Sequence, residues 1–467
     1  MKKHSFIPQG SLLDCFLSKK FNSTMFTYRE IFSMLLPILL DNFFLFICSV
    51  CSTALISSSS QESVSAVALM QPVQVTVVTL VNAFAAGGTV IVAQYKGKMD
   101  EDKTRIAGGQ VILGTMAISI VACILLSAFA FPVVNTLFRS VDEGVKIKGR
   151  DYLVGMSISM VPFAAYMSIF SVFRGIGYTK ICLRLTVIIN TIFMAASIFF
   201  INFLKLDIVG TALAMNVARV IGGSIAVYYI MGPKSPLRIR LSDIVKPRRA
   251  VLLSTLNVAI PYGVEQIFFN GGSVLVQVYM AGLGTMSVAA YAVSNSAVSL
   301  FYVAATSVGT LAITVCGRCI GARDKKRTRN YGVQMVHLSV VLSLISIVIF
   351  YPILPLLLKV YHTPLETLML IKRLLLITVV PVPVFYSMAT VMPNILRSAG
   401  DSMFSSMVSL ITMWTIRVAL GYYLGIVLGY GVLGIAACMG IECVVKTLVF
   451  GFRFRGDAWL NKKTIEE

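Results

Sequence analysis

The stretch GKMDEDKTR, residues 97–105, returns in altered form as GARDKKRTR, residues 321–329. Both copies begin with glycine, carry aspartate at the fourth position and end in Thr-Arg. Long apolar segments flank each copy, which is typical of a short polar turn between two membrane-spanning helices. The stretch therefore predicts a helical membrane chain that uses the same turn twice.

The shift in numbering that relates the two turns also relates residues far from them. It aligns Pro37 with Pro261 and Asp41 with Glu265 in the first apolar segment of each half. A single shift in numbering that aligns residues in several segments indicates an internal duplication of the sequence.

Two positions of each turn have an expected role. The first glycine, Gly97 or Gly321, is expected to adopt the left-handed conformation that ends a helix. The aspartate at the fourth position, Asp100 or Asp324, is expected to cap the next helix. The turn is thus explained by architecture, without a role in binding.

Composition places the chain in a membrane. Hydrophobic residues make up 57% of its 467 residues and charged residues only 13%. Backbone polar groups have no water partner in hydrocarbon, so the apolar segments must be helices. We expect twelve spans, at 30–57, 64–93, 107–130, 151–173, 181–203, 208–231, 252–280, 287–316, 331–357, 372–396, 403–427 and 431–452. The predicted fold class is an all-α membrane protein with two six-helix lobes.

Each predicted lobe has an even number of spans, so both enter the membrane from the same side and form parallel repeats. The expected organisation is a cytoplasmic N-terminal segment at 1–27, an N-lobe at 28–231, a cytoplasmic linker at 232–250, a C-lobe at 251–452 and a cytoplasmic tail at 453–467.

The net charge of +20 follows the positive-inside rule. With a cytoplasmic N-terminus, most of the 40 Lys and Arg residues lie on the cytoplasmic face, with dense clusters at 234–249 and 318–329. These clusters are orientation signals, so we expect both termini inside a cell membrane, contact with the lipid bilayer and no nucleic-acid partner. Residues 1–27 show no cleavable signal, and the first apolar segment is long enough to remain as a span.

Catalytic and metal-binding patterns are not evident. The pairs Cys48-x-x-Cys51 and Cys316-x-x-Cys319 lack the further His or Cys residues that a zinc site requires. No Walker motif, His-Glu-x-x-His or Gly-x-Ser-x-Gly motif is present. We therefore expect neither an enzyme nor a metal site.

Several motifs together resemble one family. GGTVIVAQYKG at 87–97, Arg-Gly-Ile-Gly at 174–177, Arg-Ser-Ala-Gly at 397–400 and Val-Gly-Thr-Ala-Leu-Ala at 209–214 are similar to those of multidrug and toxic compound extrusion (MATE) transporters. The resemblance covers about 28–452. It implies a monomeric secondary antiporter without a cofactor, in which H⁺ or Na⁺ drives export of small amphipathic organic cations by alternating access of two lobes.

The chain departs from that family at its usual cation site. Many members carry an Asp in a Val-Asp-Thr stretch of the first helix, where this chain has Cys51-Ser52 between Val50 and Thr53. Many also carry Asn-x-x-x-Asp in the fifth helix, where this chain keeps Asn190 but has Met194. An acid often found in the tenth helix is also missing. The family's cation site and its ion therefore do not transfer directly.

Asp41 and Glu265 are the alternative candidates for cation coupling or substrate binding. A charge within the membrane is costly, so each needs a reason to be there. Burial would favour proton binding near neutral pH, while Na⁺ ligation with neighbouring amides or attraction of a cationic substrate are equally open. A purely structural, hydrogen-bonded carboxyl group is the remaining alternative. The neighbouring amides in this prediction are Asn42, Gln266 and Asn270.

A second set of charges is expected to be structural. Glu442 and Lys446 have the i,i+4 order that favours an ion pair, and Arg417 should lie at a similar depth. Such a cluster could instead bind an anionic group.

Other polar or aromatic side chains are candidates for lining a cavity, although ordinary helix packing or lipid contact would explain any one of them. They are Gln71, Gln74, Asn190, Gln277, Asn295 and Phe268. Phe268 would offer cation–π contacts to amphipathic cargo. The alternative function is a flippase or exporter of lipid-linked or anionic cargo.

Overall fold

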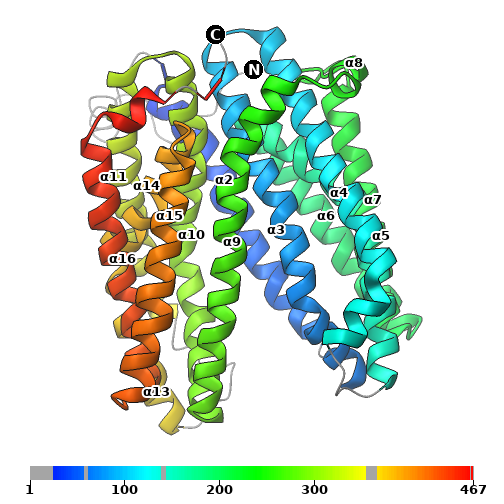
Figure 1. The fold of residues 1–467 in the computed structure, drawn as a ribbon, viewed down its shortest axis with the longest axis vertical. Helices are drawn as coiled ribbons and strands as arrows, with labels where there is room; N and C mark the ends of the chain where they lie inside the picture. Colours follow the sequence, from blue (N-terminus) through cyan, green and yellow to red (C-terminus); the bar gives the residue numbers. More distant parts are fainter. Residues whose placement is uncertain (1–24, 57–60, 138–142, 354–364, 463, 466–467) are drawn as a thin grey trace. The chain divides into compact units, whose positions relative to one another are not determined.

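The computed structural model describes residues 25–56, 61–137, 143–353, 365–462 and 464–465. Within these ranges every regular element is a helix, as Figure 1 shows. Helices satisfy their backbone hydrogen bonds internally, which is the requirement for crossing a bilayer.

Residues of the first half form α2 (Tyr28–Ile56), α3 (Gln61–Gly97), α4 (Glu101–Leu137), α5 (Glu143–Gly175), α6 (Thr179–Ile198), the π-helix η1 (Phe199–Phe203), α7 (Asp207–Met231) and the short α8 (Leu241–Val245). The second half forms α9 (Arg249–Gly282), α10 (Thr285–Gly321), α11 (Lys325–Phe350), η2 (Tyr351–Ile353), α13 (Leu365–Val379), η3 (Val382–Tyr386), α14 (Ser387–Ser398), α15 (Ser402–Thr412), η4 (Met413–Leu420), η5 (Tyr423–Val427), α16 (Gly431–Arg455) and η6 (Ala458–Asn461).

Eleven of the described helices are long and apolar enough to span a membrane. A twelfth span consists of two pieces, Thr367–Val379 and Val382–Ser398, which meet at an angle of 46°. Pro381 lies at this break, where a proline cannot donate the hydrogen bond that would continue the helix. The predicted all-α class with twelve spans is therefore confirmed, and the tenth span is bent.

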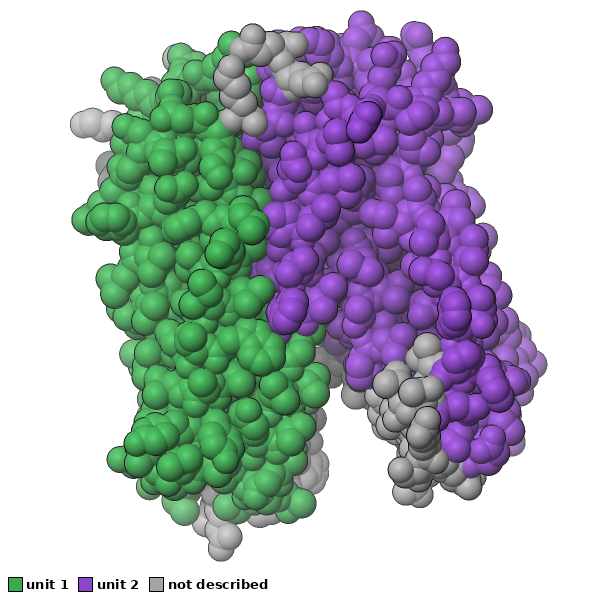
Figure 2. Space-filling model, viewed as in Figure 1, with its two compact units in different colours: residues 1–40, 177–180, 269–462 green, residues 41–176, 181–268, 463–467 purple. Residues whose placement is uncertain are grey.

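The chain forms two compact units, which Figure 2 colours separately. One unit consists of residues 1–40, 177–180 and 269–462, and the other of 41–176, 181–268 and 463–467. The division falls inside α2 after Leu40 and inside α9 after Phe268, so each of these helices contributes to both units. The lobe and linker boundaries expected from the sequence stay a prediction.

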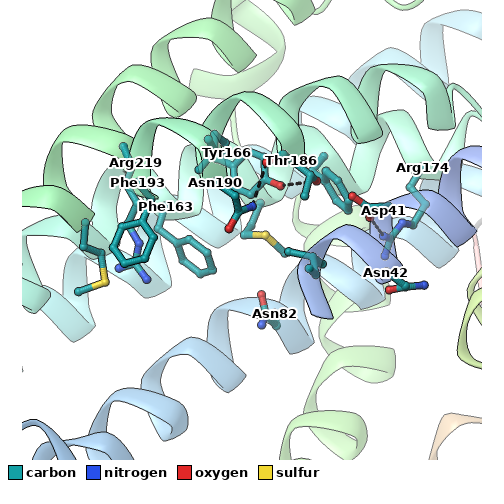
Figure 3. Close-up of a pocket in the computed structure, with 16 residues that line it drawn as sticks. Asp41, Asn42, Asn82, Phe163, Tyr166, Arg174, Thr186, Asn190, Phe193 and Arg219 are labelled. Carbon is teal, nitrogen blue, oxygen red and sulfur yellow. Dashed lines mark hydrogen bonds and ion pairs between the residues drawn. The ribbon is translucent and has the colours of Figure 1, made fainter. Parts of the chain in front are cut away.

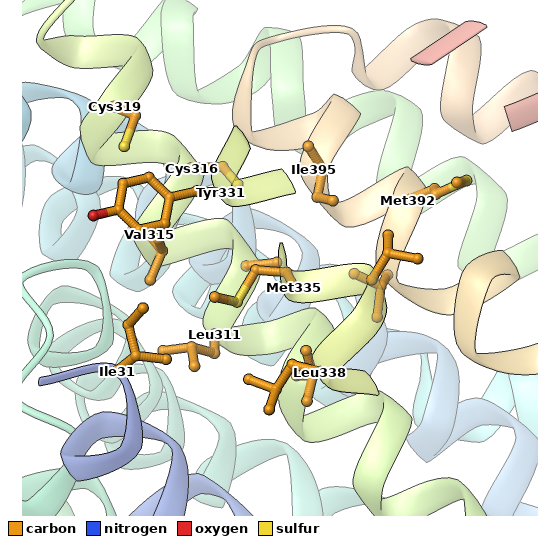
Figure 4. Packing of buried hydrophobic residues seen from close by; sticks show 14 of the residues in the cluster. Ile31, Leu311, Val315, Cys316, Cys319, Tyr331, Met335, Leu338, Met392 and Ile395 are labelled. Carbon is orange, nitrogen blue, oxygen red and sulfur yellow. The ribbon is translucent and has the colours of Figure 1, made fainter. Parts of the chain in front are cut away.

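The unit that contains residues 269–462 has a core built from α10, α11, α14 and the start of α2. Figure 4 shows Ile31, Leu311 and Met335 in this cluster, and all three side chains are fully buried. The Tyr331 hydroxyl accepts a hydrogen bond from the Phe26 N–H at 2.8 Å and donates one to the Phe26 carbonyl at 3.0 Å. A buried tyrosine thus satisfies backbone groups that precede α2.

The repeated turn is partly as expected. The Asp100 carboxylate accepts from the Lys103 N–H and the Asp324 carboxylate from the Arg327 N–H, both at 2.9 Å, so both predicted N-caps are confirmed.

The prediction that Gly97 and Gly321 adopt the left-handed conformation was wrong. The residues of the turn with positive φ are Met99 (61°) and Arg323 (59°). Gly97 and Gly321 are instead the last residues of α3 and α10, because each helix continues through its glycine before the chain reverses.

The two halves differ in length near their ends. The spacing from Gly177 to Gly400, both with positive φ, is one residue shorter than the spacing from Gly210 to Gly434. An extra residue therefore lies between Gly400 and Gly434. The π-helix η4 falls in this interval, and α6 has no π-helix at the corresponding position. An α-helix that gains one residue accommodates it as a wider π turn, so η4 accounts for the extra residue.

Candidate functional site

A cavity of about 480 Å³ lies within the unit that contains residues 41–176 and 181–268. Helices α2, α3, α5, α6 and α7 contribute its walls. Its polar lining residues are Asp41, Asn42, Asn82, Tyr166, Arg174, Thr186, Asn190 and Arg219. Its apolar lining residues are Leu45, Phe163, Met167, Phe170, Ile189, Phe193, Met215 and Ala218. Half of these residues are polar, but apolar atoms form most of the surface of the wall, which is typical of a small-molecule site.

One end of the cavity holds a buried ion pair. Asp41 Oδ2 lies 3.6 Å from Arg174 Nη2, and the Asp41 side chain is only 3% exposed. The Arg174 guanidinium also lies over the Phe170 ring, 4.4 Å from its centroid. Arg174 comes from the last turn of α5 and Asp41 from the middle of α2, so helix packing brings the two charges together.

Arg219 on α7 occupies the other end, beside Phe163 and Phe193 (Figure 3). Its Nη1 donates to Ser159 Oγ at 2.6 Å, and its guanidinium lies 4.5 Å from the centroid of the Phe163 ring. Among the described residues no carboxylate pairs with it. Arg219 therefore brings a positive charge into the cavity that no described acid balances.

Between the two ends lie neutral polar groups. The Tyr166 and Thr186 hydroxyls are 3.2 Å apart, and the Asn190 amide donates to the Thr186 carbonyl at 2.9 Å. The Asn82 carboxamide faces the same region (Figure 3). Its buried Oδ1 has no hydrogen-bond partner within the described part of the chain, which leaves this group available to a ligand.

Three residues selected from the sequence meet in this cavity: Asp41, Asn42 and Asn190. Glu265 is buried at 7% exposure and Gln266 is half-buried, and neither lines the cavity. Their participation in coupling or binding stays a prediction.

The remaining candidates lie elsewhere. In the same unit, Gln74 accepts from the Tyr152 hydroxyl at 2.9 Å, while Gln71 and Phe268 are exposed. In the other unit, Asn270 is half-buried, and Gln277 and Asn295 are exposed. None of these six residues lines the cavity.

The predicted charge cluster is compact. Glu442 Oε2 lies 2.6 Å from Arg417 Nε, and Glu442 Oε1 lies 2.6 Å from Lys446 Nζ. Both cations also lie over the Phe269 ring, at 5.0 Å and 5.8 Å from its centroid. Arg417 belongs to η4, the π-helix in the longer interval of the second half. Whether the cluster is only structural stays a prediction.

Sequence reasoning missed the cavity residues Asn82, Phe163 and Arg174 and gave Arg219 no role at the site. Two signals were available. Arg219 is one of few basic residues within a span, and Arg174 begins the Arg-x-x-Gly pattern that recurs at 397–400. Neither signal indicates which side chains Arg174 and Arg219 contact.

No group of three or more His, Cys, Asp or Glu side chains in the described ranges could hold a metal ion. Asp41 with the adjacent Asn42 offers oxygen ligands of the kind that hard cations prefer.

The fold and the cavity define a class: a polytopic α-helical membrane transporter with two repeated halves. The MatE family model matches residues 37–199 and 261–423, two segments that begin at the aligned prolines Pro37 and Pro261. These matches cover well over half of the chain, so the chain belongs to the MatE family, the MATE transporters that the sequence resembles.

Curated relatives agree with this assignment. The uncharacterized transporter YisQ of Bacillus subtilis (strain 168) is 22% identical over 437 residues, which cover 93% of this chain and 95% of YisQ. The probable multidrug resistance protein NorM of Halalkalibacterium halodurans is 23% identical over 405 residues, which cover 84% of this chain and 86% of NorM.

Solved structures share the fold. A MATE family transporter of the MOP superfamily in an outward-facing conformation matches with a TM-score of 0.82 at 17% identity, covering 91% of this chain and 96% of that chain. A MOP superfamily transporter from Pyrococcus furiosus matches with a TM-score of 0.78 at 17% identity, covering 93% of this chain and 97% of that chain. The latter is described as having a binding pocket of reverse polarity that suggests a different function.

Proposed function

We propose that the chain is a secondary active exporter that moves small amphipathic organic compounds against H⁺ or Na⁺ by alternating access. The observation that carries this proposal is the cavity of about 480 Å³, which combines a mostly apolar wall with the Asp41 carboxylate. A ligand of modest size could bury its apolar body there while its polar group meets a fixed partner. Organic cations are the cargo that the family resemblance implies, and lipid-linked or anionic cargo is the alternative.

Asp41 is the best-placed coupling group. Its carboxylate is buried in the cavity wall, 3.6 Å from Arg174. Protonation or Na⁺ binding would weaken the attraction to Arg174 and so change the energy of the helix contact between α2 and α5. A cation that binds one conformation better than the other shifts the equilibrium between them, which is what antiport requires.

The remaining parts of the proposal follow the sequence. The protein would act as a monomer in the cell membrane, with both termini cytoplasmic and with no cofactor besides the transported ion. Glu265 would be a second candidate coupling group in the duplicate position to Asp41. We propose no catalytic step.

The test is efflux from proteoliposomes that contain the purified full-length chain. Ethidium serves as the cationic probe and pyrenebutyrate as the anionic probe, each first under an imposed pH gradient and then under a Na⁺ gradient. We expect one gradient to drive efflux of at least one of the two probes, and we expect Asp41→Asn to abolish the dependence of that efflux on the gradient. Glu143→Gln is the matched control, because the Glu143 carboxylate is 73% exposed and does not line the cavity.

A double variant separates coupling from structure. Asp41→Asn alone leaves Arg174 without its buried counter-ion, which could disturb folding by itself. Asp41→Asn combined with Arg174→Gln removes both charges. If the double variant regains gradient-driven efflux, Asp41 is only a counter-ion and its coupling role is wrong. If neither gradient drives efflux of ethidium by folded wild-type protein, the organic-cation form of the proposal is wrong.

A further inference from the structure

We propose that the cavity binds the negatively charged head of its cargo, and that Arg219 is the residue that anchors a carboxylate there. The inference rests on the proposed function, since it assigns a chemical class to the compound that the exporter would move. The expected ligand is a small organic anion with a planar carboxylate and an aromatic or apolar body.

The balance of charge in the cavity wall is the first argument. Its lining contains three residues that carry charge: Asp41, Arg174 and Arg219. Asp41 and Arg174 form an ion pair and largely cancel. The charge of Arg219 remains, so the cavity attracts anions and repels cations at the Arg219 end.

Within the described chain, Arg219 also lacks the partner that a charge within a membrane normally has. Charged side chains within spans usually pair with one another or serve a pathway, because their transfer into the bilayer is costly. Arg219 contacts the Ser159 hydroxyl and the face of the Phe163 ring, and both are uncharged. An anionic ligand would supply the missing counter-charge.

The geometry suits a carboxylate in particular. A guanidinium carries five N–H donors in a rigid plane, and one hydrogen bond to Ser159 engages a single nitrogen of Arg219. Contact with the Phe163 ring occupies the face of the guanidinium and leaves donors at its edge. Two parallel N–H donors along such an edge match the two oxygens of a carboxylate.

Asn82 supplies an independent polar contact. Its buried Oδ1 has no hydrogen-bond partner among the described residues, although it lies in the wall of the cavity. An amide oxygen in this state favours a ligand that carries a hydrogen-bond donor in addition to its carboxylate. The aromatic and sulfur-containing side chains of Phe163, Phe193 and Met167 would contact the apolar body of the ligand.

A cationic cargo fits the same wall less well. Asp41 is the one acid among the described lining residues, and it already pairs with Arg174. The fifth-helix position that is acidic in many relatives holds Met194 in this chain. A cation would have to break the Asp41–Arg174 pair or bind without a free carboxylate.

The test compares three probes that share one fluorescent body: pyrenebutyrate, pyrenebutanol and pyrenebutylammonium. Binding to the full-length protein in lipid nanodiscs is followed by pyrene anisotropy, with protein-free nanodiscs as the background. We expect wild-type protein to bind pyrenebutyrate at least about tenfold more tightly than the alcohol, which is the scale of one charge-assisted bidentate contact.

Arg219→Gln should reduce the affinity for pyrenebutyrate by about tenfold or more and leave the alcohol within about twofold. Arg219→Lys keeps the charge but loses the planar pair of donors, so an intermediate affinity is expected. Arg184→Gln is the control, because Arg184 lies on α6 with an exposed side chain and does not line the cavity.

Two results would overturn the inference. Wild-type protein that binds pyrenebutyrate no better than the alcohol or the ammonium probe rules out an anion site, and this comparison needs no variant. An equal loss of affinity for all three probes in folded Arg219→Gln protein would show that Arg219 is structural.

The failure of this inference can be told apart from the failure of the proposed function. Selective binding of pyrenebutyrate without gradient-driven efflux would support the anion site and contradict the proposed export. Gradient-driven efflux of ethidium without selective binding of pyrenebutyrate would support export and contradict the anion site.

Discussion

Arg105 and Asp243 form an ion pair, with Nε 2.9 Å from Oδ2, although 138 residues separate them in the chain. The pair attaches the segment after α7 to the start of α4. The second half repeats this device: Arg329 Nη2 lies 2.8 Å from Asp457 Oδ1, in the segment after α16. Arg105 and Arg329 are the last residues of the two repeated turns. Each copy of the turn therefore holds the segment that follows the last membrane-spanning helix of its own half, α7 or α16.

The two attachments should differ in strength. Asp243 is 8% exposed and also accepts from the Arg240 N–H at 2.9 Å, whereas the Asp457 side chain is 72% exposed. Asp243→Ala should lower the free energy of unfolding by about 1–3 kcal/mol, because it leaves buried donors unpaired. Asp457→Ala should cost about 0–1 kcal/mol. Thermal unfolding in detergent micelles measures both, and an equal effect would contradict the difference in burial.

Gly109 should be required for the same attachment. A Cβ atom at Gly109 would lie 2.5 Å from the backbone oxygen of Asp243, which cannot move without displacing α8. Gly109→Ala is therefore expected to destabilise the protein by about 1–3 kcal/mol. Gly271→Ala is the control, since a Cβ there meets nothing within 4 Å and should be neutral or stabilise by about 0.5–1 kcal/mol. A Gly109→Ala protein with the thermal unfolding midpoint of the wild type would show that α8 is free to shift.

Met99 is expected to be a site where glycine stabilises. Its φ of 61° is left-handed, which costs a residue with a Cβ about 1–2 kcal/mol. The side chain is 84% exposed, so removing it loses little packing. The greater chain entropy of glycine offsets about 0.5–1 kcal/mol, so Met99→Gly should gain about 0.5 kcal/mol. Met99→Ala keeps the Cβ and should show no gain, and a gain of equal size there would point to side-chain loss as the cause.

Glu442 should be essential to the stability of its cluster. It is fully buried and balances Arg417 and Lys446, each at 2.6 Å. Glu442→Gln should cost about 3–5 kcal/mol, because two largely buried cations then lack a counter-charge. Replacing all three side chains together, by Arg417→Met, Glu442→Leu and Lys446→Met, should restore most of that loss. The unfolding midpoints of the single and triple variants decide this, and a triple variant as unstable as Glu442→Gln would mean that the charges act separately.

Much of the fold could be predicted because its causes are local. The length of each apolar segment requires a helix, and the Asp at the fourth position of each turn caps the helix that follows it. The shift that aligns Pro37 with Pro261 predicted two related halves from the order of residues alone. The left-handed residue was expected at Gly97 but is Met99, because the end of a helix depends on how far its packing extends, which composition does not encode.

The site could be predicted only in part. Asp41 was selected because a charge within a membrane is unusual, and Asn190 because of a family motif. Arg174 and Arg219 were visible as charges, but their partners were not, since apolar residues occur on every side of α5 and α7 and no separate polar face indicates how these helices are rotated.

The sequence by itself thus determined the class, the repeat, the turns and the family, because these depend on the order and composition of residues near one another. Only the tertiary structure decided that Asp41 meets Arg174 and that Arg219 meets Phe163 and no described carboxylate. These contacts depend on how each helix is rotated about its axis relative to its neighbours. In an apolar bundle, the close packing of many side chains sets this rotation, and no single residue determines it.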